Sequence, residues 1–198
     1  MTATSWPVSE LSLIHRDALS RHFLALDHEG RRLRFGVAMS DTAVRAYIAR
    51  TDFERDAIFG VFDEQLKVIG AAHVAYSVEH AELGVSVLRT DRNRGIGGAL
   101  FARAVLRARN WGVPALLVHC LRENDAIMYV ARKQGMRIRS DKAEADAWLN
   151  LRPADASTHF GEVFAQRAAL FDYAVKSQLA GARRLLTATL SFSQARDD

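Results

Sequence analysis

The chain has 198 residues, of which 49% are hydrophobic and 25% are charged, and its formal net charge is +4. This length supports one well-buried core, and twelve glycines with three prolines exclude a low-complexity or disordered chain. The single cysteine, Cys120, excludes an internal disulfide framework and fits a reducing compartment.

The N-terminal sequence MTATSWPVSELSLI lacks a basic region followed by an apolar one, so we expect no signal peptide. No apolar run approaches the ~20 residues of a membrane span. We therefore expect a soluble, cytoplasmic protein with no membrane partner. A basic chain attracts nucleic acid or an anionic ligand, but no basic patch interleaved with aromatic residues favours nucleic acid. A polyanionic cofactor accounts for the arginines equally well.

The first quarter of the chain predicts a helix, a strand and a second helix. Residues 9–27 place apolar side chains at helical spacing, and residues 28–30 are interpreted as the end of that helix. Residues 33–39 predict a strand. Ser40 then gives an N-cap signal for a helix over residues 42–51.

Strand-like runs and helical runs alternate through the middle of the chain. Three strands are predicted first, and the short turn at residues 79–80 indicates that the second and third form a hairpin. A helix over residues 97–111 and a buried apolar strand over residues 114–120 follow. A helix over residues 124–134 and two final strands complete the set. This order predicts an α/β (α+β) sandwich with a largely antiparallel N-terminal sheet and one β-α-β crossover.

From Ser157 the chain is again helical in pattern, and Gly181 is interpreted as an interruption. Its apolar stripe is anchored by Phe160, Phe164, Phe171 and Val175. Such a face must be buried, either on the chain's own sheet or on a second subunit. We favour a homodimer formed through this helix.

A glycine cluster between arginines carries the chemistry. It has the pattern R-x-x-G-x-G, and its members are Arg92, Arg94, Gly95, Ile96, Gly97 and Gly98. Glycines let the backbone approach a ligand closely, and the first amides of a helix attract a pyrophosphate. The P-loop lysine is missing, and Leu100 stands where a dinucleotide fingerprint needs its third glycine. The alternative interpretation is an ordinary glycine-rich turn before a helix.

This stretch resembles the acetyl-CoA-binding motif of the GNAT superfamily of N-acetyltransferases, and the resemblance extends from about residue 33 to residue 151. It implies the GNAT fold, a mostly antiparallel mixed sheet flanked by helices, here with a C-terminal helical extension. It also implies that acetyl-CoA is the co-substrate, with its pyrophosphate held by the backbone amides of the glycine cluster. The strand at Val87 and Leu88 and the side chain of Asn124 would hold the pantetheine arm.

The resemblance divides the chain into three parts. Residues 1–32 form an N-terminal helical segment of the same domain, residues 33–152 form the acetyl-CoA-binding core, and residues 153–198 form the C-terminal helix and tail. Many GNAT enzymes carry a tyrosine acid seven residues after the asparagine, but here that position holds Ala131. Tyr129 is interpreted either as a replacement acid or as a packing or surface residue.

Glu82 is the candidate base. It resembles the base of "AEFAV"-like strands in bacterial protein lysine acetyltransferases, which are also similar to this chain at the sequence ARKQGM and are the nearest relatives we suggest. An amine must lose a proton before it attacks a thioester, which gives Glu82 its role. The alternative is a solvated carboxylate at a strand edge.

Five other residues have a structural or surface interpretation. His73 is interpreted as a packed histidine, and His119 as a hydrogen-bonded core histidine or a proton relay. Cys120 is either buried or a covalent nucleophile. His15 and His22 are interpreted as a surface coincidence. No spacing of metal ligands is present in the sequence, so we expect no metal.

The arginines raise two further possibilities. Arg103 and Arg107 either approach the 3′-phosphate of the co-substrate or are solvated surface residues. A second group hints at an acidic or carboxylate-bearing acceptor, or else is surface charge. That group comprises Arg21, Arg31, Arg32, Arg34 and Arg45.

The sequence therefore predicts an acetyl-CoA-dependent N-acetyltransferase that acts on a primary amine by direct attack in a ternary complex. The rivals are a non-catalytic acyl-CoA-binding or sensing protein and an interaction protein that kept the fold. Protein lysine, polyamine, amino acid and antibiotic acceptors all remain open.

Overall fold

The computed structural model describes residues 6–194, with side chains described for residues 6–183. Its core is a mixed, mostly antiparallel sheet in the order β1-β2-β3-β4-β5-β7-β6. The strands are β1 (Ser9–Leu11), β2 (Ala57–Phe62), β3 (Val68–Tyr76), β4 (Ala81–Val87), β5 (Ala115–Leu121), β6 (Arg137–Asp141) and β7 (Glu144–Asn150). The expected α/β class is confirmed.

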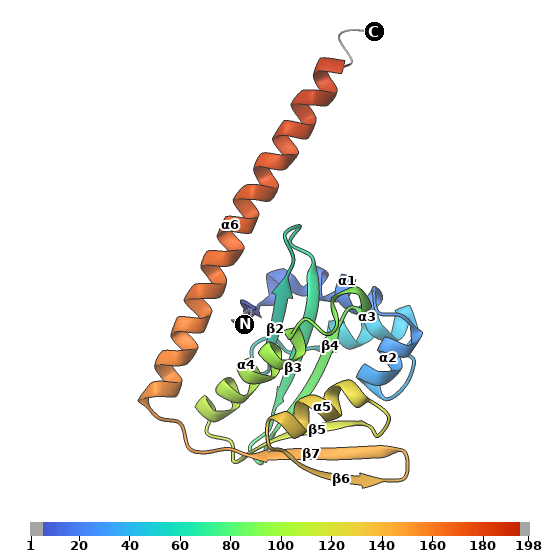
Figure 1. The fold of residues 1–198 in the computed structure, drawn as a ribbon, viewed down its shortest axis with the longest axis vertical. Coiled ribbons are helices and arrows are strands. Elements are labelled where there is room, and N and C mark those ends of the chain that lie inside the picture. The colour runs from blue at the N-terminus through green and yellow to red at the C-terminus, as the bar shows by residue number, and fades with distance from the viewer. Residues whose placement is uncertain (1–5, 195–198) are drawn as a thin grey trace.

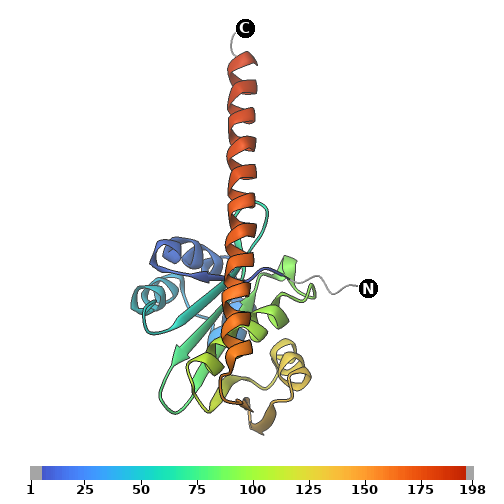
Figure 2. The same ribbon diagram turned by 90° about the vertical axis from the view of Figure 1, so that its left-hand side faces the viewer.

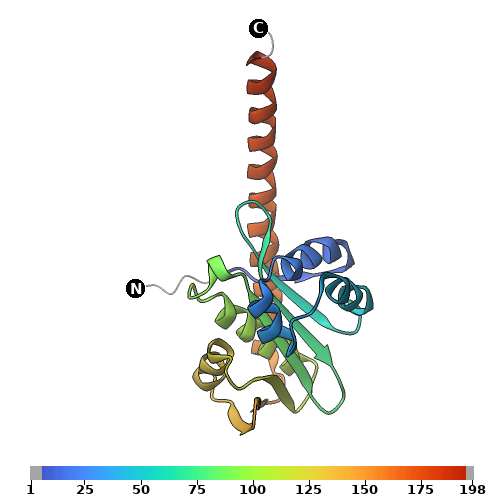
Figure 3. The ribbon, with the colours of Figure 1, turned by 90° about the vertical axis from the view of Figure 1, so that its right-hand side faces the viewer.

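Helices cover both faces of this sheet (Figures 2 and 3). One group is α1 (Arg16–Leu24), α2 (His28–Phe35) and α3 (Asp41–Arg50), and the opposite group is α4 (Ile96–Asn110) and α5 (Asp125–Lys133). Two 3-10 turns, η1 (Leu13–His15) and η2 (Arg89–Asp91), precede α1 and α4. The predicted β-α-β crossover is confirmed, because β4 and β5 are parallel with α4 between them.

The N-terminal expectations are partly wrong. Residues 9–11 form β1 rather than a helix, because they pair antiparallel with β2 in the register Leu11↔Ile58. Residues 28–35 form α2 rather than a helix end followed by a strand. The Asp27 carboxylate accepts a hydrogen bond from the Gly30 amide at 2.7 Å and so caps that helix.

The helix α6 (Ala156–Gln194) projects far beyond the sheet (Figure 1). It runs through Gly181 without a break, so the predicted interruption is wrong. One face of its N-terminal half packs on the chain's own domain, where Tyr173 meets Phe62 edge to face and Ala169 is buried. The predicted apolar stripe lies on another face and remains exposed, including Phe164 and Phe171.

Candidate functional site

The site begins where the sheet opens. Strands β4 and β5 pair over only two positions, Ala81↔Leu116 and Glu82↔Leu117, and then part. Beyond Glu82, one edge of β4 therefore has no neighbouring strand. Strand β4 is therefore splayed from β5 over the stretch that the family resemblance assigns to the pantetheine arm.

The hydrogen-bonding register determines which backbone groups of β4 face the opening. The Leu88 amide donates to the Ile69 carbonyl of β3 at 2.9 Å. Because residues of an antiparallel pair alternate in direction, the amides of Val85 and Val87 point the other way, toward the opening. The Leu88 amide is therefore engaged, and the amides of Val85 and Val87 are the backbone donors that face a ligand.

The glycine cluster forms the turn between β4 and α4. Asn93 and Gly95 both have positive φ, 61° and 84°, which curls the loop so that successive amides face one side. No side chain caps α4, and a Cβ at Gly97 or Gly98 would meet nothing within 4 Å. The predicted anion site therefore has uncapped helix amides and open space beside them, which is what a pyrophosphate requires.

The two arginines of the cluster brace this loop. Arg92 donates from Nε to the Val87 carbonyl at 3.3 Å. Arg94 pairs with Asp91 and lies over the ring of Trp6, and the Trp6 indole donates to the Arg94 carbonyl at 2.7 Å. Sequence reasoning missed Trp6, which no local signal near the cluster could reveal.

Asn124 has a structural role that the resemblance did not imply. Its Oδ1 accepts from the Ile127 amide at 3.3 Å and caps α5, and its Nδ2 donates to the Leu33 carbonyl at 3.1 Å. It thereby ties α5 to α2. Tyr129, the possible replacement acid, is 65% exposed and does not line the cavity described next, whereas Ala131 is buried.

A cavity of about 460 Å³ lies on the α1–α3 side of the sheet, beside the opening. Its walls come from α2 and the loop after it, α3, β3, β4, β5 and the start of β7. The polar side chains that line it are Arg34, Tyr47, His73, Glu82, His119 and Glu144. The predicted base, Glu82, thus lies in this cavity, at the last paired position before β4 and β5 part.

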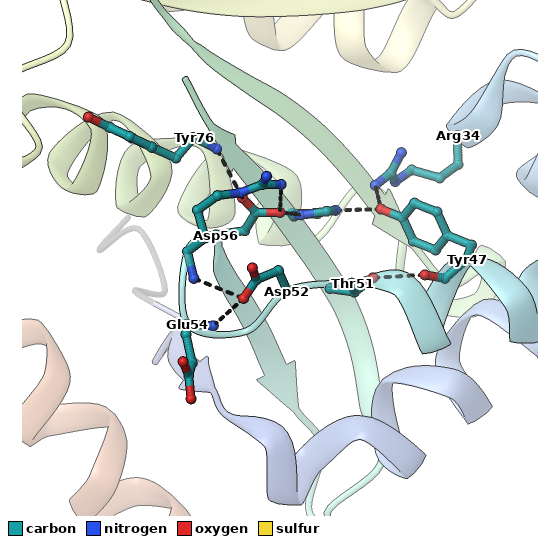
Figure 4. A network of polar contacts seen from close by, with 9 residues as sticks. Arg34, Tyr47, Thr51, Asp52, Glu54, Asp56 and Tyr76 are labelled. Atoms are coloured by element: carbon teal, nitrogen blue, oxygen red, sulfur yellow. Dashed lines mark hydrogen bonds and ion pairs between the residues drawn. The ribbon is translucent and has the colours of Figure 1, made fainter. Parts of the chain in front are cut away.

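A chain of polar contacts connects Arg34 to Asp56 (Figure 4), and its members Arg34, Tyr47 and His73 line the cavity. Arg34 Nη2 donates to the Tyr47 hydroxyl at 3.1 Å, and that hydroxyl contacts His73 Nδ1. His73 Nε2 lies 2.9 Å from the buried carboxylate of Asp56. A neutral His73 with its proton on Nε2 satisfies every partner, because it accepts from Tyr47 and donates to Asp56.

Burial sets the protonation of this chain. It lowers the pKa of His73, although the Asp56 carboxylate opposes that shift. Burial raises the pKa of Asp56, but hydrogen bonds from Arg55 and His73 outweigh it and leave that pKa below its usual value. The ionised Asp56 and neutral His73 therefore persist together near pH 7. The interpretation of His73 as a packed histidine is incomplete, because it also lines the cavity.

His119 and Cys120 lie on opposite faces of β5. His119 is half exposed in the cavity, and its Nδ1 lies 2.7 Å from Asp146, which raises the pKa of His119. The core interpretation of His119 is therefore wrong. Cys120 is buried beside Met128, and burial raises the pKa of its thiol, so it is not an activated nucleophile.

Three other expectations are corrected. His22 is buried rather than at the surface, with Nδ1 2.9 Å from the Val68 carbonyl and Nε2 2.8 Å from the Ser86 hydroxyl. Arg103 and Arg107 neither face the glycine cluster nor stand free in solvent. Both pair with Glu162 of α6, and Arg103 is 4% exposed.

The described residues include neither a metal-binding cluster nor a helix that could span a membrane. No group of three or more His, Cys, Asp and Glu side chains there is placed to hold a metal ion. No helix in the same part of the chain has the length and apolar character needed to cross a membrane. The cytoplasmic location stays a prediction.

Comparisons with known proteins agree with this geometry. The model of the acetyltransferase (GNAT) family matches residues 26–136. The GNAT domain of PAT from Streptomyces lividans is 16% identical, with a TM-score of 0.62 over 73% of this chain and 89% of that one. No curated protein matches the chain significantly.

Two further solved structures share the fold. A ribosomal-protein-alanine N-acetyltransferase from Brucella melitensis is 16% identical, with a TM-score of 0.58 over 73% of this chain and 99% of that one. RimL, a ribosomal L7/L12 α-N-protein acetyltransferase in complex with coenzyme A, is 14% identical. Its TM-score is 0.59 over 76% of this chain and 97% of that one. The family match covers more than half of the sequence, and so this chain belongs to the GNAT family of acetyltransferases and is an acyltransferase.

Proposed function

We propose that this protein transfers an acetyl group from acetyl-CoA to a primary amine, by direct attack of the amine in a ternary complex. One observation carries the proposal: a single strand, β4, joins the anion site to the cavity. Glu82 lies in the cavity near its start, and the open loop follows its end. The Cα atoms of Glu82 and Val87 are about 17 Å apart along the strand, so an extended donor fits between the two sites.

The backbone binds the donor in this proposal. The amides of Gly95 to Gly98 hold the pyrophosphate, and the free edge of β4 holds the pantetheine arm. The Val85 amide, which also faces the opening and lies about 10 Å from Glu82 along the strand, stabilises negative charge that develops on the thioester oxygen. Asn124 supports this arrangement through the cap of α5 rather than through a free amide group.

Glu82 removes the proton from the acceptor, directly or through water. The amine nitrogen then bonds to the carbonyl carbon, the carbon–sulfur bond breaks, and the thiolate leaves and takes a proton from solvent. The acceptor is a protein lysine or a small amine. The runner-up is an acyl-CoA-binding protein without turnover, which Ala131 in place of the usual tyrosine favours.

Thiol release from acetyl-CoA, measured against a panel of amines and lysine peptides, tests the proposal. We expect Glu82→Gln to lower kcat by about 10²- to 10⁴-fold without changing acetyl-CoA affinity, since a positioned base contributes that much. Gly97→Trp fills open space and should abolish binding. Binding without turnover for every acceptor would favour the sensor, and an equal loss of binding in Glu82→Gln would make Glu82 structural.

We also propose that α6 mediates a homodimer. Its exposed apolar side chains include Phe160, Phe164 and Phe171, which the chain's own domain does not cover. A second copy of the same helix offers a matching apolar face. Light scattering on the full chain and on the double variant Phe164→Glu/Phe171→Glu tests this. A dimer converted to a monomer supports it, and an identical monomer in both contradicts it.

A further inference from the structure

We propose that Arg34 binds the carboxylate of the acceptor, so that the acceptor is a small amino acid rather than a simple amine. This inference rests on the proposed transfer to an amine and names its substrate class. The three arginines of α2 differ in their partners. Arg31 pairs with Asp41 at 2.7 Å, and Arg32 pairs with Glu29 at 2.9 Å. Among the described residues, no carboxylate pairs with Arg34, which is also the arginine of α2 that lines the cavity.

The guanidinium of Arg34 packs closely against the backbone of β4. It lies directly over Gly84 of β4, where a Cβ would be only 2.4 Å from the Arg34 Cζ. Any other residue at position 84 would occupy that space. Three rings surround the same group, with centroids 5.6, 4.8 and 5.8 Å from Cζ; they belong to Phe23, Phe35 and Tyr47.

The hydrogen-bonding capacity of Arg34 is largely unused. A guanidinium carries five N–H donors, and here one donates to the Tyr47 hydroxyl. The Nε atom is fully buried and has no partner. A partly buried cation without a counter-charge is unfavourable unless a ligand supplies that charge. A carboxylate matches the fork of a guanidinium and would supply that counter-charge.

The polar chain below Arg34 fixes its orientation. The Tyr47 hydroxyl can accept from Arg34 because it donates to His73, and His73 in turn donates to Asp56. When His73 is neutral, every hydrogen bond in this chain has one donor and one acceptor. The guanidinium is therefore preorganised, which reduces the entropy lost on binding an anion.

The opposite charge in the cavity has the spacing that an amino acid requires. Glu82 and Gly84 share one face of β4 and lie about 7 Å apart along the strand. Arg34 over Gly84 and the carboxylate of Glu82 therefore face a ligand with opposite charges, one for a carboxylate and one for an ammonium. A volume of about 460 Å³ suits a small molecule.

Paired acceptors test the inference. The probes are the twenty L-amino acids, β-alanine, γ-aminobutyrate and 5-aminovalerate, each measured beside its carboxamide. The kcat/KM ratio of acid to amide is measured in the wild type, in Arg34→Gln and in Arg32→Gln, a matched control whose side chain lies outside the cavity. Comparing one pair of acceptors across the variants cancels the difference in amine pKa between acid and amide.

We expect Arg34→Gln to lower this ratio by about 10- to 100-fold for the preferred acceptor, as the loss of a charge-assisted pair implies. Arg32→Gln should leave it unchanged. Gly84→Ala is a second variant, which displaces the guanidinium without removing it and should lower the ratio similarly. A ratio that is the same in all four proteins overturns the inference while the proposed transfer stands.

A binding measurement separates the two proposals. The shift in Tm caused by each amino acid is recorded with CoA present. If no amine is acetylated but an amino acid raises Tm only when Arg34 is intact, the proposed transfer fails and the carboxylate site stands. If neither turnover nor an Arg34-dependent shift is seen, the carboxylate site is overturned as well.

Discussion

Acidification should destabilise this protein through His22. Burial lowers the pKa of His22 from 6.5 to about 4, with a smaller contribution from the charge of Arg34. Because its Nδ1 faces the Val68 carbonyl, Nδ1 carries the proton and Nε2 accepts from the Ser86 hydroxyl. Protonation of Nε2 would remove that acceptor and place a charge in the core beneath β4.

The sign and size of the effect follow from linkage. A folded-state pKa below the unfolded value means that the stability from neutral His22 is complete above pH 6.5 and is lost as the pH falls to about 4. At about 1.4 kcal/mol per pKa unit, the full loss of stability is somewhat more than 3 kcal/mol. About 2 kcal/mol of it falls between pH 7.5 and pH 5, before most carboxylates titrate.

Urea denaturation of the wild type and of His22→Gln at pH 7.5 and pH 5 measures this. The free energy of unfolding of the wild type should fall by about 2 kcal/mol more than that of the variant. The comparison matters because burial also lowers the pKa of His73, whose titration contributes in both proteins. Equal pH dependence in the two proteins would refute the assignment of the acid loss to His22.

Two further substitutions test the docking of α6 and the glycine loop. Burial alone would raise the pKa of Glu162, but hydrogen bonds from Asn110 and two arginines lower it to about 2. Glu162→Gln should therefore leave buried Arg103 without its nearest carboxylate and lower the free energy of unfolding by about 3 kcal/mol. An effect no larger than that of Glu29→Gln, at an exposed pair, would contradict this. Gly98 lies in α4, and a Cβ there would meet nothing within 4 Å, so calorimetry of Gly98→Ala should show an equal or higher Tm. The same methyl group should weaken acetyl-CoA binding. Unchanged binding would place the donor elsewhere.

Local patterns predict the region around β4 and α4 well. The strand, the glycine turn and the helix follow one another in sequence. The spacing of apolar residues, the turn residues and the family resemblance therefore all indicate the same elements. The N-terminal region is different. Residues 9–11 become a strand only because β2, about 50 residues later in the chain, offers them an edge. The start of α2 was predictable in principle, because Asp27 is one of the residue types favoured at a helix N-cap.

The candidate site was predictable only where the family resemblance reached it. Glu82 was named from its strand motif, and it lines the cavity. The chain from Arg34 through Tyr47 and His73 to Asp56 joins four separate segments, so no spacing in the sequence indicates it. The faces of β5 were also ambiguous, because an apolar run does not show whether His119 or Cys120 points inward.

The surroundings of Arg34 and Arg103 differ in a way that explains why only Arg34 supports a functional inference. Arg103 is more deeply buried, but Glu162 and Glu10 compensate its charge, and the cluster fastens α6 to the domain. Arg34 contacts three aromatic rings and has no such carboxylate among the described residues, although its neighbours Arg31 and Arg32 pair with Asp41 of α3 and Glu29 of α2. A chain that pairs Arg31 and Arg32 within the fold but leaves Arg34 facing a cavity retains an unfavourable charge there. Residues that break local consistency in this way concentrate at binding sites, because the ligand completes the set of contacts that the fold leaves open.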